Sequence, residues 1–387
     1  MHNILAVELS GGKDCYVSVE LPLTAYEMLD ALDKLRITPQ EEPDWEILAL
    51  IDYPELRDWI GSGSVYELNA LTMRLSELND QERVAFDGLL EMEKEKGQKI
   101  IPMHRLLDLA YSTDQCHLLG DIQTAEQLGR FAAENGFVPQ VDLMSDELFE
   151  MLDFRIIGER FMRSEGGVIV KGGYVAQDGD LEQDVWQKLD LPIHRPDYTV
   201  LLELSRADSN QRTTLALPAS PSEMDASLDR IGAAGWDDVS YVCIDCRVPA
   251  LCELITDADN AAHANRTAEY LDRLQDSELP KYKALLGALD IAELHEALDL
   301  TQRLDEYQLS PEQVSFEGVG HSNLMNSVDE QAIETLLPHV NLYLYGHALQ
   351  TEGKVALTSY GSVERTDGQP LMAAGAEEKL GMEMMPT

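Results

Sequence analysis

Apolar and polar residues alternate at the start of the chain, a pattern typical of half-buried β-strands. The alternation covers residues 4–9 and 16–21, with Gly11 and Gly12 between them, and predicts a β-hairpin. A helix over residues 24–35 should follow, because Thr24 and Glu27 have the spacing of a capping box. Residues 46–51 predict a third strand. The chain is therefore expected to begin with a small sheet and one helix.

Helical periodicity replaces this alternation further along the chain. Leu68, Leu71, Leu75 and Leu78 recur at steps of three and four residues, which places them on one helix face. Helices are predicted over residues 65–78, 81–95, 102–111 and 124–135. A last helix near residues 153–163 leads into a strand over residues 168–171. The predicted fold class is α+β, with a small N-terminal β-sheet plus helix, a central helical cluster and a short C-terminal helix and strand element.

The second half of the chain repeats the first. Residues 21–35 (LPLTAYEMLDALDKL) align without a gap with residues 217–231 (LPASPSEMDASLDRI). The same offset pairs Asn69 with Asn265, and further matches keep their order along the chain, which indicates a tandem duplication. We predict an elongated protein with a first repeat, an acidic linker, a second repeat and a flexible tail, over residues 1–177, 178–196, 197–366 and 367–387.

The chain carries an unusual excess of acid. Its 387 residues include 71 Asp and Glu against 29 Lys and Arg, a formal charge of −42 that is shared equally by residues 1–196 and 197–387. A field of this sign repels nucleic acids and anionic membranes, because binding to phosphate requires Lys and Arg. No apolar run reaches the roughly 18 residues of a membrane-spanning helix, and no signal peptide is recognisable. We expect a cytoplasmic protein that binds neither nucleic acid nor membrane directly and whose partner has a basic surface.

Two motifs are similar to ligand sites, but simpler interpretations exist. The run SGGKD, from Ser10 to Asp14, is similar to the phosphate-binding loop of PP-loop ATP pyrophosphatases. The residues after it alternate as a strand, and the matching segment of the second repeat lacks glycine, so a hairpin turn accounts for both copies. Cys243 and Cys246 have the spacing of half a zinc site, but no second ligand pair follows. We expect no enzyme activity, no cofactor and no metal.

Acidic residues gather on the predicted helices and their connections. Residues 111–153 contain nine acids and one base, and residues 287–337 contain eleven acids and one base. Carboxylates three or four residues apart on a helix lie about 5–6 Å apart at Cβ, comparable with the phosphate spacing along DNA. Because normal surfaces intersperse both signs, these segments predict an acidic surface that mimics duplex DNA. Its predicted members are Glu77, Asp80, Glu82, Glu91, Asp114, Asp121, Glu126, Asp142, Asp146, Glu147, Glu150, Asp290, Glu293, Glu296, Asp299, Asp305, Glu306 and Glu312.

The sequence also resembles a known family. Residues 66–71 (YELNAL) and 75–78 (LSEL) are similar to the middle region of ArdA-type antirestriction proteins. Residues 128–139 (LGRFAAENGFVP) and 154–159 (FRIIGE) are similar to the C-terminal region of that family. The resemblance covers most of the first repeat and, more weakly, the second. It implies an elongated, acidic, dimeric DNA mimic of mobile elements that occupies the DNA-binding groove of type I restriction-modification enzymes, on their methyltransferase and specificity core.

This chain departs from that family pattern by carrying two repeats. Fusion could replace dimerisation with an intramolecular association, so we predict a pseudo-dimer within one chain. The second repeat has lost much of the LGRFAAENGFVP stretch. The target could also be another basic DNA-binding protein. Two alternatives of other classes remain: a PP-loop-like nucleotide-dependent enzyme that uses Ser10 to Asp14, and an acidic protein-interaction adaptor of a mobile element.

Overall fold

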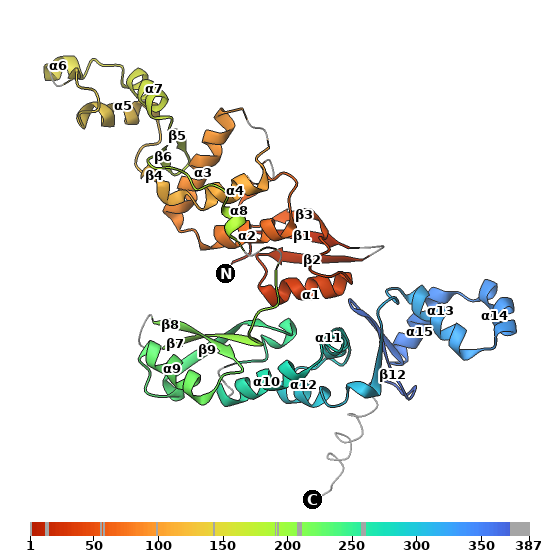
Figure 1. Cartoon of the computed structure of the whole chain (residues 1–387). Coiled ribbons are helices and arrows are strands. Elements are labelled where there is room, and N and C mark those ends of the chain that lie inside the picture. Colours follow the sequence, from red (N-terminus) through yellow and green to blue (C-terminus); the bar gives the residue numbers. More distant parts are fainter. Residues whose placement is uncertain are drawn as a thin grey trace, which may run out of the picture. The chain divides into compact units, whose positions relative to one another are not determined.

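The computed structural model describes residues 2–11, 15–54, 56, 59–97, 100–141, 144–189, 191, 193–206, 211–256 and 261–371. The protein is α+β, as the sequence predicts, and its strands form small three-stranded sheets (Figure 1). None of the described helices combines the length and the apolar character needed to cross a membrane. Contacts divide the chain into two compact units. The first comprises Met1–Leu9, Ser18–Leu23 and Glu42–His194, and the second comprises Ser10–Val17, Thr24–Glu41 and Arg195–Thr387.

The first unit contains two sheets with helices between and around them. The first sheet has the order β2-β1-β3, and the second has the order β4-β6-β5. The predicted helix face is confirmed, because Leu68, Leu71, Leu75 and Leu78 are buried. The elements are β1 (Leu5–Ser10), β2 (Tyr16–Leu21), β3 (Asp44–Leu50), α2 (Val65–Glu77), α3 (Asp80–Glu95), α4 (Met103–Ala110), the 3-10 helix η2 (Thr113–Gln115), β4 (Cys116–Leu119), α5 (Ala125–Glu134), α6 (Asp146–Phe149), α7 (Phe154–Glu165), β5 (Val168–Val170), β6 (Gly173–Gln177) and α8 (Val185–Lys188).

The second unit has a similar order of elements, with the additional helix α9 between β8 and β9 and with no described helix after β12. Its sheets have the orders β8-β7-β9 and β10-β12-β11. Its elements are β7 (Val200–Arg206), β8 (Arg212–Leu217), α9 (Pro221–Ile231), η4 (Trp236–Asp238), β9 (Val239–Cys246), η5 (Pro249–Leu251), α10 (Ala261–Arg273), α11 (Leu279–Ala288), α12 (Leu294–Leu300), η6 (Leu304–Glu306), β10 (Tyr307–Ser310), α13 (Phe316–Ser327), α14 (Glu330–Leu336), η7 (Leu337–His339), α15 (Leu342–Thr351), β11 (Val355–Thr358) and β12 (Gly361–Arg365).

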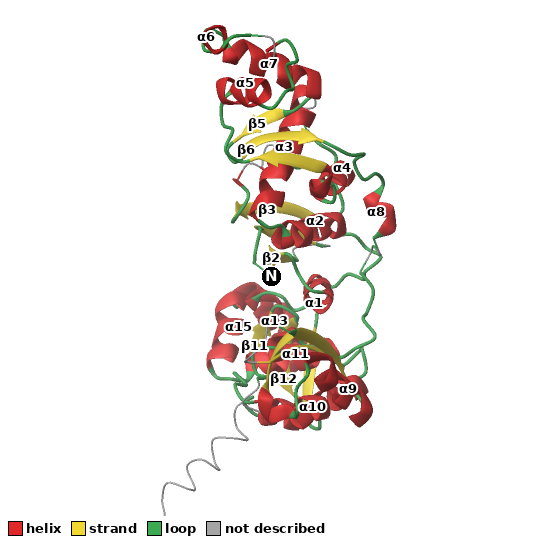
Figure 2. Ribbon diagram, turned by 90° about the vertical axis from the view of Figure 1, so that its left-hand side faces the viewer, coloured by secondary structure: helices red, strands yellow, loops and turns green. Residues whose placement is uncertain are grey.

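Of the second sheet of each repeat, the sequence predicted only the strand over residues 168–171, which is β5 (Val168–Val170); the pairing into a sheet was not predicted. In the first unit, β4 pairs antiparallel with β6 from Cys116 opposite Gln177 to Leu119 opposite Tyr174. Helix α3 packs on β5 and β6 of this sheet (Figure 2). A Cβ atom on Gly88 of α3 would lie 2.6 Å from Val175, so only glycine permits this approach. The two strands that were missed, β4 and β6, have four and five residues, too few positions for a clear alternating pattern.

Both repeats cross their late helices at glycine pairs. In the first repeat, a Cβ atom on Gly129 of α5 or Gly158 of α7 would lie 1.8 Å from a backbone carbonyl oxygen of the opposite helix. In the second repeat, Gly320 of α13 and Gly346 of α15 stand in the same relation, at 2.2 and 2.0 Å. Any larger residue would force these helices apart. The glycine pairs therefore align Gly129 with Gly320 and Gly158 with Gly346, independently of the sequence match between the repeats.

An asparagine fixes the same chain segment in each repeat; Asn69 is buried and Asn265 is half-buried. The Asn69 side chain accepts a hydrogen bond from the Leu23 N–H at 2.7 Å and donates to its carbonyl at 3.0 Å. Asn265 makes the same two bonds to Ala219, at 2.7 and 3.1 Å. In both cases the bonded residue directly precedes the N-cap of the next helix. The asparagine thus satisfies the backbone groups of the segment that leads into the helix, and at Leu23 these groups would otherwise be buried without partners.

Helix α1 (Ala25–Leu35) lies within the first repeat of the sequence but belongs to the second compact unit. It contacts β9 and η5. Its apolar side chains Tyr26, Met28, Leu32 and Leu35 are buried. The compact units therefore differ from the sequence repeats in the segments Ser10–Val17 and Thr24–Glu41.

Part of the segment predicted as an acidic linker is folded. Helix α8 packs on α4, where Val185 is buried and its N–H donates to the Asp108 carboxylate at 2.9 Å. The Glu182 N–H donates to the Ser112 hydroxyl at 2.8 Å. In the predicted tail, Leu371 is buried, and residues 372–387 lie outside the described residues.

Candidate acidic binding surface

Several of the predicted surface acids are engaged by cations. The partners and their N–O distances are Arg74 for Glu77 at 4.0 Å and for Glu82 at 3.1 Å, Lys94 for Glu91 at 3.0 Å, Arg130 for Glu150 at 3.1 Å, and Arg303 for Glu306 at 2.9 Å. Asp142 lies outside the described residues. A paired carboxylate presents less field to a partner, so these acids contribute less to a mimic surface.

Two of the paired acids have clear structural roles. The Glu82 carboxylate accepts from the Asn79 N–H at 2.9 Å and completes the capping box of α3. This backbone hydrogen bond lowers the pKa of Glu82. The Arg130 guanidinium donates to both carboxylate oxygens of Glu150, at 3.2 and 3.1 Å, and lowers the pKa of Glu150. Sequence patterns place such residues on helices but do not show what they bind.

The other predicted acids form no ion pair with any described Lys or Arg. All are exposed except Glu296, which is half-buried. The single base of each acid-rich segment is already occupied, because Arg130 binds Glu150 and Arg303 binds Glu306. The acids left unpaired are Asp80, Asp114, Asp121, Glu126, Asp146, Glu147, Asp290, Glu293, Glu296, Asp299, Asp305 and Glu312.

Three of these acids surround the edge strand β4. Asp114 lies in η2 just before the strand, Asp121 follows it in the turn, and Glu126 lies in the first turn of α5. All three are exposed. The strand is at the edge of its sheet because the order is β4-β6-β5. We call Asp114, Asp121 and Glu126 the first acidic triplet.

The second repeat has acids at the same three positions around β10. The register given by Gly129 and Gly320 pairs Asp114 with Asp305, Asp121 with Glu312 and Glu126 with Glu317. Asp305 lies in η6, Glu312 follows β10, and Glu317 lies in the first turn of α13. We call Asp305, Glu312 and Glu317 the second acidic triplet. Like the first, it is exposed and free of ion pairs to described Lys and Arg residues.

The same local structure positions both triplets. After β4, the Ile122 N–H donates to the Leu119 carbonyl at 3.1 Å, and the Thr124 side chain accepts from Gln127 N–H as the N-cap of α5. After β10, Gln313 donates to Ser310 at 3.2 Å and Ser315 caps α13. Glu126 and Glu317 therefore stand at helix N-termini, where the helix dipole favours negative charge.

Glu317 was missed by sequence reasoning, although a signal was present. Thr124 and Ser315 are both N-cap residue types, and each is followed two positions later by glutamate. The difference in residue number between matching positions of the two repeats changes in this region. Glu317 can therefore be matched to Glu126 only after Gly129 has been aligned with Gly320. At the two triplets, both repeats present exposed carboxylates at three matching positions.

The two other candidate sites from the sequence are the run from Ser10 to Asp14 and the pair Cys243 and Cys246. Of the run from Ser10 to Asp14, Gly12, Lys13 and Asp14 lie outside the described residues, and the following residues form strand β2. Among the described residues, no group of three or more His, Cys, Asp or Glu side chains is arranged to hold a metal ion. Cys243 and Cys246 lie on β9 as free thiols.

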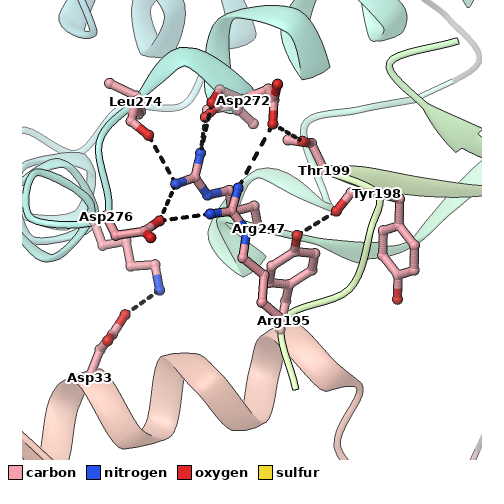
Figure 3. A network of polar contacts seen from close by, with 11 residues as sticks. Asp33, Arg195, Tyr198, Thr199, Arg247, Asp272, Leu274 and Asp276 are labelled. Carbon is pink, nitrogen blue, oxygen red and sulfur yellow. Dashed lines mark hydrogen bonds and ion pairs between the residues drawn. The ribbon is translucent and has the colours of Figure 1, made fainter. Parts of the chain in front are cut away.

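A polar network in the second unit centres on Arg247 (Figure 3). The Arg247 side chain is 2% exposed and donates to the carbonyl oxygen of Leu274 at 2.9 Å, next to the end of α10. It also pairs with Asp276, which binds Arg195 at 3.0 Å. A cation at a helix C-terminus satisfies carbonyl groups that have no partner within the helix. We therefore assign this network to the stability of the fold.

No protein-family model matches this sequence, and no curated protein shows significant similarity to it.

Proposed function

We propose that this protein is a non-enzymatic DNA mimic that occupies the DNA-binding groove of a type I restriction-modification enzyme. The observation that carries the proposal is the pair of acidic triplets. Few identities survive between the repeats, yet Asp114, Asp121 and Glu126 of the first repeat have acidic counterparts in the second. All six acids are exposed, and none is neutralised by a described Lys or Arg.

The physical basis is the exchange of ions at the partner's groove. A groove that binds DNA carries Lys and Arg with associated counterions, and a surface of fixed carboxylates replaces these ions as phosphates do. Acids that already hold a cation of their own cannot do this without breaking an ion pair. The unpaired triplets can. The total charge of −42 also accelerates the encounter with a basic partner.

The choice of partner rests on the sequence resemblance to ArdA-type antirestriction proteins. The two repeats within one chain would then supply the two acidic surfaces that a dimer supplies in that family. An acidic adaptor would also carry exposed acids, but it would have no reason to compete with DNA. Competition with DNA therefore separates the two functions.

The full chain should be tested for binding to a type I methyltransferase core that includes its specificity subunit. We expect binding that duplex DNA displaces and that weakens steeply between about 50 and 500 mM salt. Binding that duplex DNA does not displace would favour the adaptor. A rise in melting temperature with ATP would favour the nucleotide-dependent enzyme, because a ligand that binds the native state stabilises it.

Neutral variants of the triplets test the observation itself. Asp114→Asn/Asp121→Asn/Glu126→Gln and Asp305→Asn/Glu312→Gln/Glu317→Gln should each weaken binding and lower the salt slope by about one for each carboxylate that no longer pairs with a partner cation. The matched control Asp225→Asn/Asp237→Asn/Asp238→Asn removes the same charge from exposed residues outside the triplets. If the control weakens binding as much as either triplet variant, net charge alone is responsible and the assigned surface is wrong.

A further inference from the structure

Three of the five cysteines lie close together in the second unit. Cys243 and Cys246 lie on β9, and Cys252 directly follows η5. The turn formed by η5 brings Cys252 back to the strand, so that the Sγ atoms of Cys243 and Cys252 are 2.9 Å apart. Both are free thiols. The corresponding strand β3 of the first repeat (Asp44–Leu50) contains no cysteine, so the cluster belongs to the second repeat alone.

The geometry of this thiol pair suits a covalent bond. A disulfide requires a sulfur–sulfur distance of about 2.05 Å, so a movement of less than ~1 Å along the line joining the sulfurs is enough. The two residues are already held by separate elements, a strand and a turn. Small side-chain rotations can therefore close the bond without moving the backbone far.

A small reagent can reach the pair. Cys243 and Cys252 are half-buried and line a surface cavity of about 410 Å³ together with Ser240 and Thr256. Cys246 is fully buried and does not line this cavity. The accessible partners for oxidation are thus Cys243 and Cys252.

We propose that Cys243 and Cys252 form a reversible redox modification site, at which a low-molecular-weight disulfide such as glutathione disulfide converts the two thiols into an intramolecular disulfide. One thiolate attacks the reagent and breaks its S–S bond, which forms a mixed disulfide and releases one glutathione. The second thiolate then attacks the protein sulfur of the mixed disulfide and releases the second glutathione. The pair loses two electrons and two protons, and the reagent is reduced to two thiols.

The chemical environment of the pair slows its reaction with such a reagent. Hydrogen bonds with Cys246 and Cys252, together with burial, raise the pKa of the Cys243 thiol. Thiolate is the reacting form, so exchange at neutral pH is slow. Under reducing conditions the pair remains two thiols.

The bond would reinforce the surface that holds α1. Strand β9 and the η5 turn both contact α1, and Asp245, two residues from Cys243, accepts a hydrogen bond from the Thr24 hydroxyl at 2.7 Å. A cross-link between strand and turn reduces the freedom of the unfolded chain. The oxidised protein should therefore melt at a higher temperature, and a reductant should reverse the increase.

The test uses the full chain treated with glutathione disulfide and then mapped by mass spectrometry. We expect the loss of two hydrogen atoms from the intact mass and a cross-linked peptide pair that contains Cys243 and Cys252. Cys243→Ser and Cys252→Ser should each abolish the cross-link and the reversible rise in melting temperature. The control variants Cys15→Ser and Cys116→Ser should retain both.

Cys246→Ser decides between the possible partners. Retention of the cross-link in this variant supports the assignment to Cys243 and Cys252. A cross-link between Cys243 and Cys246 in the wild-type chain, glutathione adducts without any intramolecular bond, or no change in mass would each overturn the proposal.

Discussion

Helices α1 and α9 occupy the same position in the two repeats and begin in the same way. Thr24 caps α1 and Ser220 caps α9, each in a complete capping box with a glutamate three residues later. Both helices end in a left-handed residue. Their surroundings nevertheless differ. Six residues of α1 are buried, among them Asp30, whereas α9 buries only Ser227, Leu228 and Ile231.

The difference comes from polar partners that only the second unit provides. The Lys283 ammonium is 4% exposed and lies 2.8 Å from both Asp30 and Asp33. The Tyr360 hydroxyl donates to Asp30 at 2.7 Å. In α9 the residue that corresponds to Asp30 is Ala226. A buried carboxylate is tolerated only with such partners.

The partners themselves are also absent from the first repeat. Asp87 stands at the position of Lys283, and Gly172 stands at the position of Tyr360. Asp33 recurs as Asp229, but Asp30, which accepts from Lys283, and Lys283 itself have no counterpart of the same charge in the other repeat. Local sequence makes both segments helical, and buried tertiary partners determine that α1 is the helix enclosed by the second unit. The predictions below test this contrast.

Lys283→Ala should give the largest effect. The substitution leaves Asp30 buried with only Lys34 as a nearby cation, at 2.8 Å. Removing one partner of a buried ion pair costs about 3–5 kcal/mol. Urea unfolding of the full chain should show this loss in the transition of the second unit. Lys354→Ala is the control, because that exposed lysine pairs with exposed Glu352 and a surface ion pair contributes little to stability. Equal losses in the two variants would show that the buried pair does not hold α1.

Removing the N-cap hydroxyl should destabilise the protein more at α1 than at α9. Thr24 accepts from the Glu27 N–H and also donates to the buried Asp245 carboxylate at 2.7 Å. Ser220 serves only its own helix, through Glu223. We expect Thr24→Ala to cost about 2–3 kcal/mol and Ser220→Ala about 1 kcal/mol in unfolding free energy. Thr24→Ser should restore the wild-type value. If the two alanine variants lose the same stability, the bond to Asp245 contributes nothing.

These pairs also show what the sequence can predict. The cap of α1 was predicted from Thr24 and Glu27, because capping is a local interaction. The unit to which α1 belongs was not predicted, because Lys283 lies far away in the sequence and reads as an ordinary surface lysine. The acid-rich segments were predicted from charge. Which acids stay unpaired depended on single contacts such as Arg130 with Glu150 and Arg74 with Glu82.

The stability of the second unit should fall at acid pH, and Asp30 should contribute to this fall. Burial alone would raise the pKa of Asp30, but Lys283 and Lys34 outweigh it and lower that pKa below its ordinary value. A lowered folded-state pKa gives stability that is present above the unfolded-state value, about 3.9, and is lost as pH falls through the folded-state value. Unfolding free energy measured against pH should therefore decline less steeply below about pH 4 in Asp30→Asn than in the wild type. An identical decline would show that Asp30 does not titrate with folding.

Tyr360→Phe should give the smallest effect of the series. Burial raises the pKa of Tyr360, so its hydroxyl stays protonated and donates to Asp30. The substitution removes this donor and leaves Asp30 with Lys283 and Lys34, so we expect a loss of about 1 kcal/mol. The exposed Tyr343→Phe is the control and should be neutral. In the Lys283→Ala background the tyrosine becomes one of the last partners of Asp30. Tyr360→Phe should then cost more than it does alone, and the excess, measured as a double-mutant cycle, gives the coupling between the two groups. A coupling of zero would mean that Lys283 and Tyr360 stabilise α1 independently and that Asp30 is not their common partner.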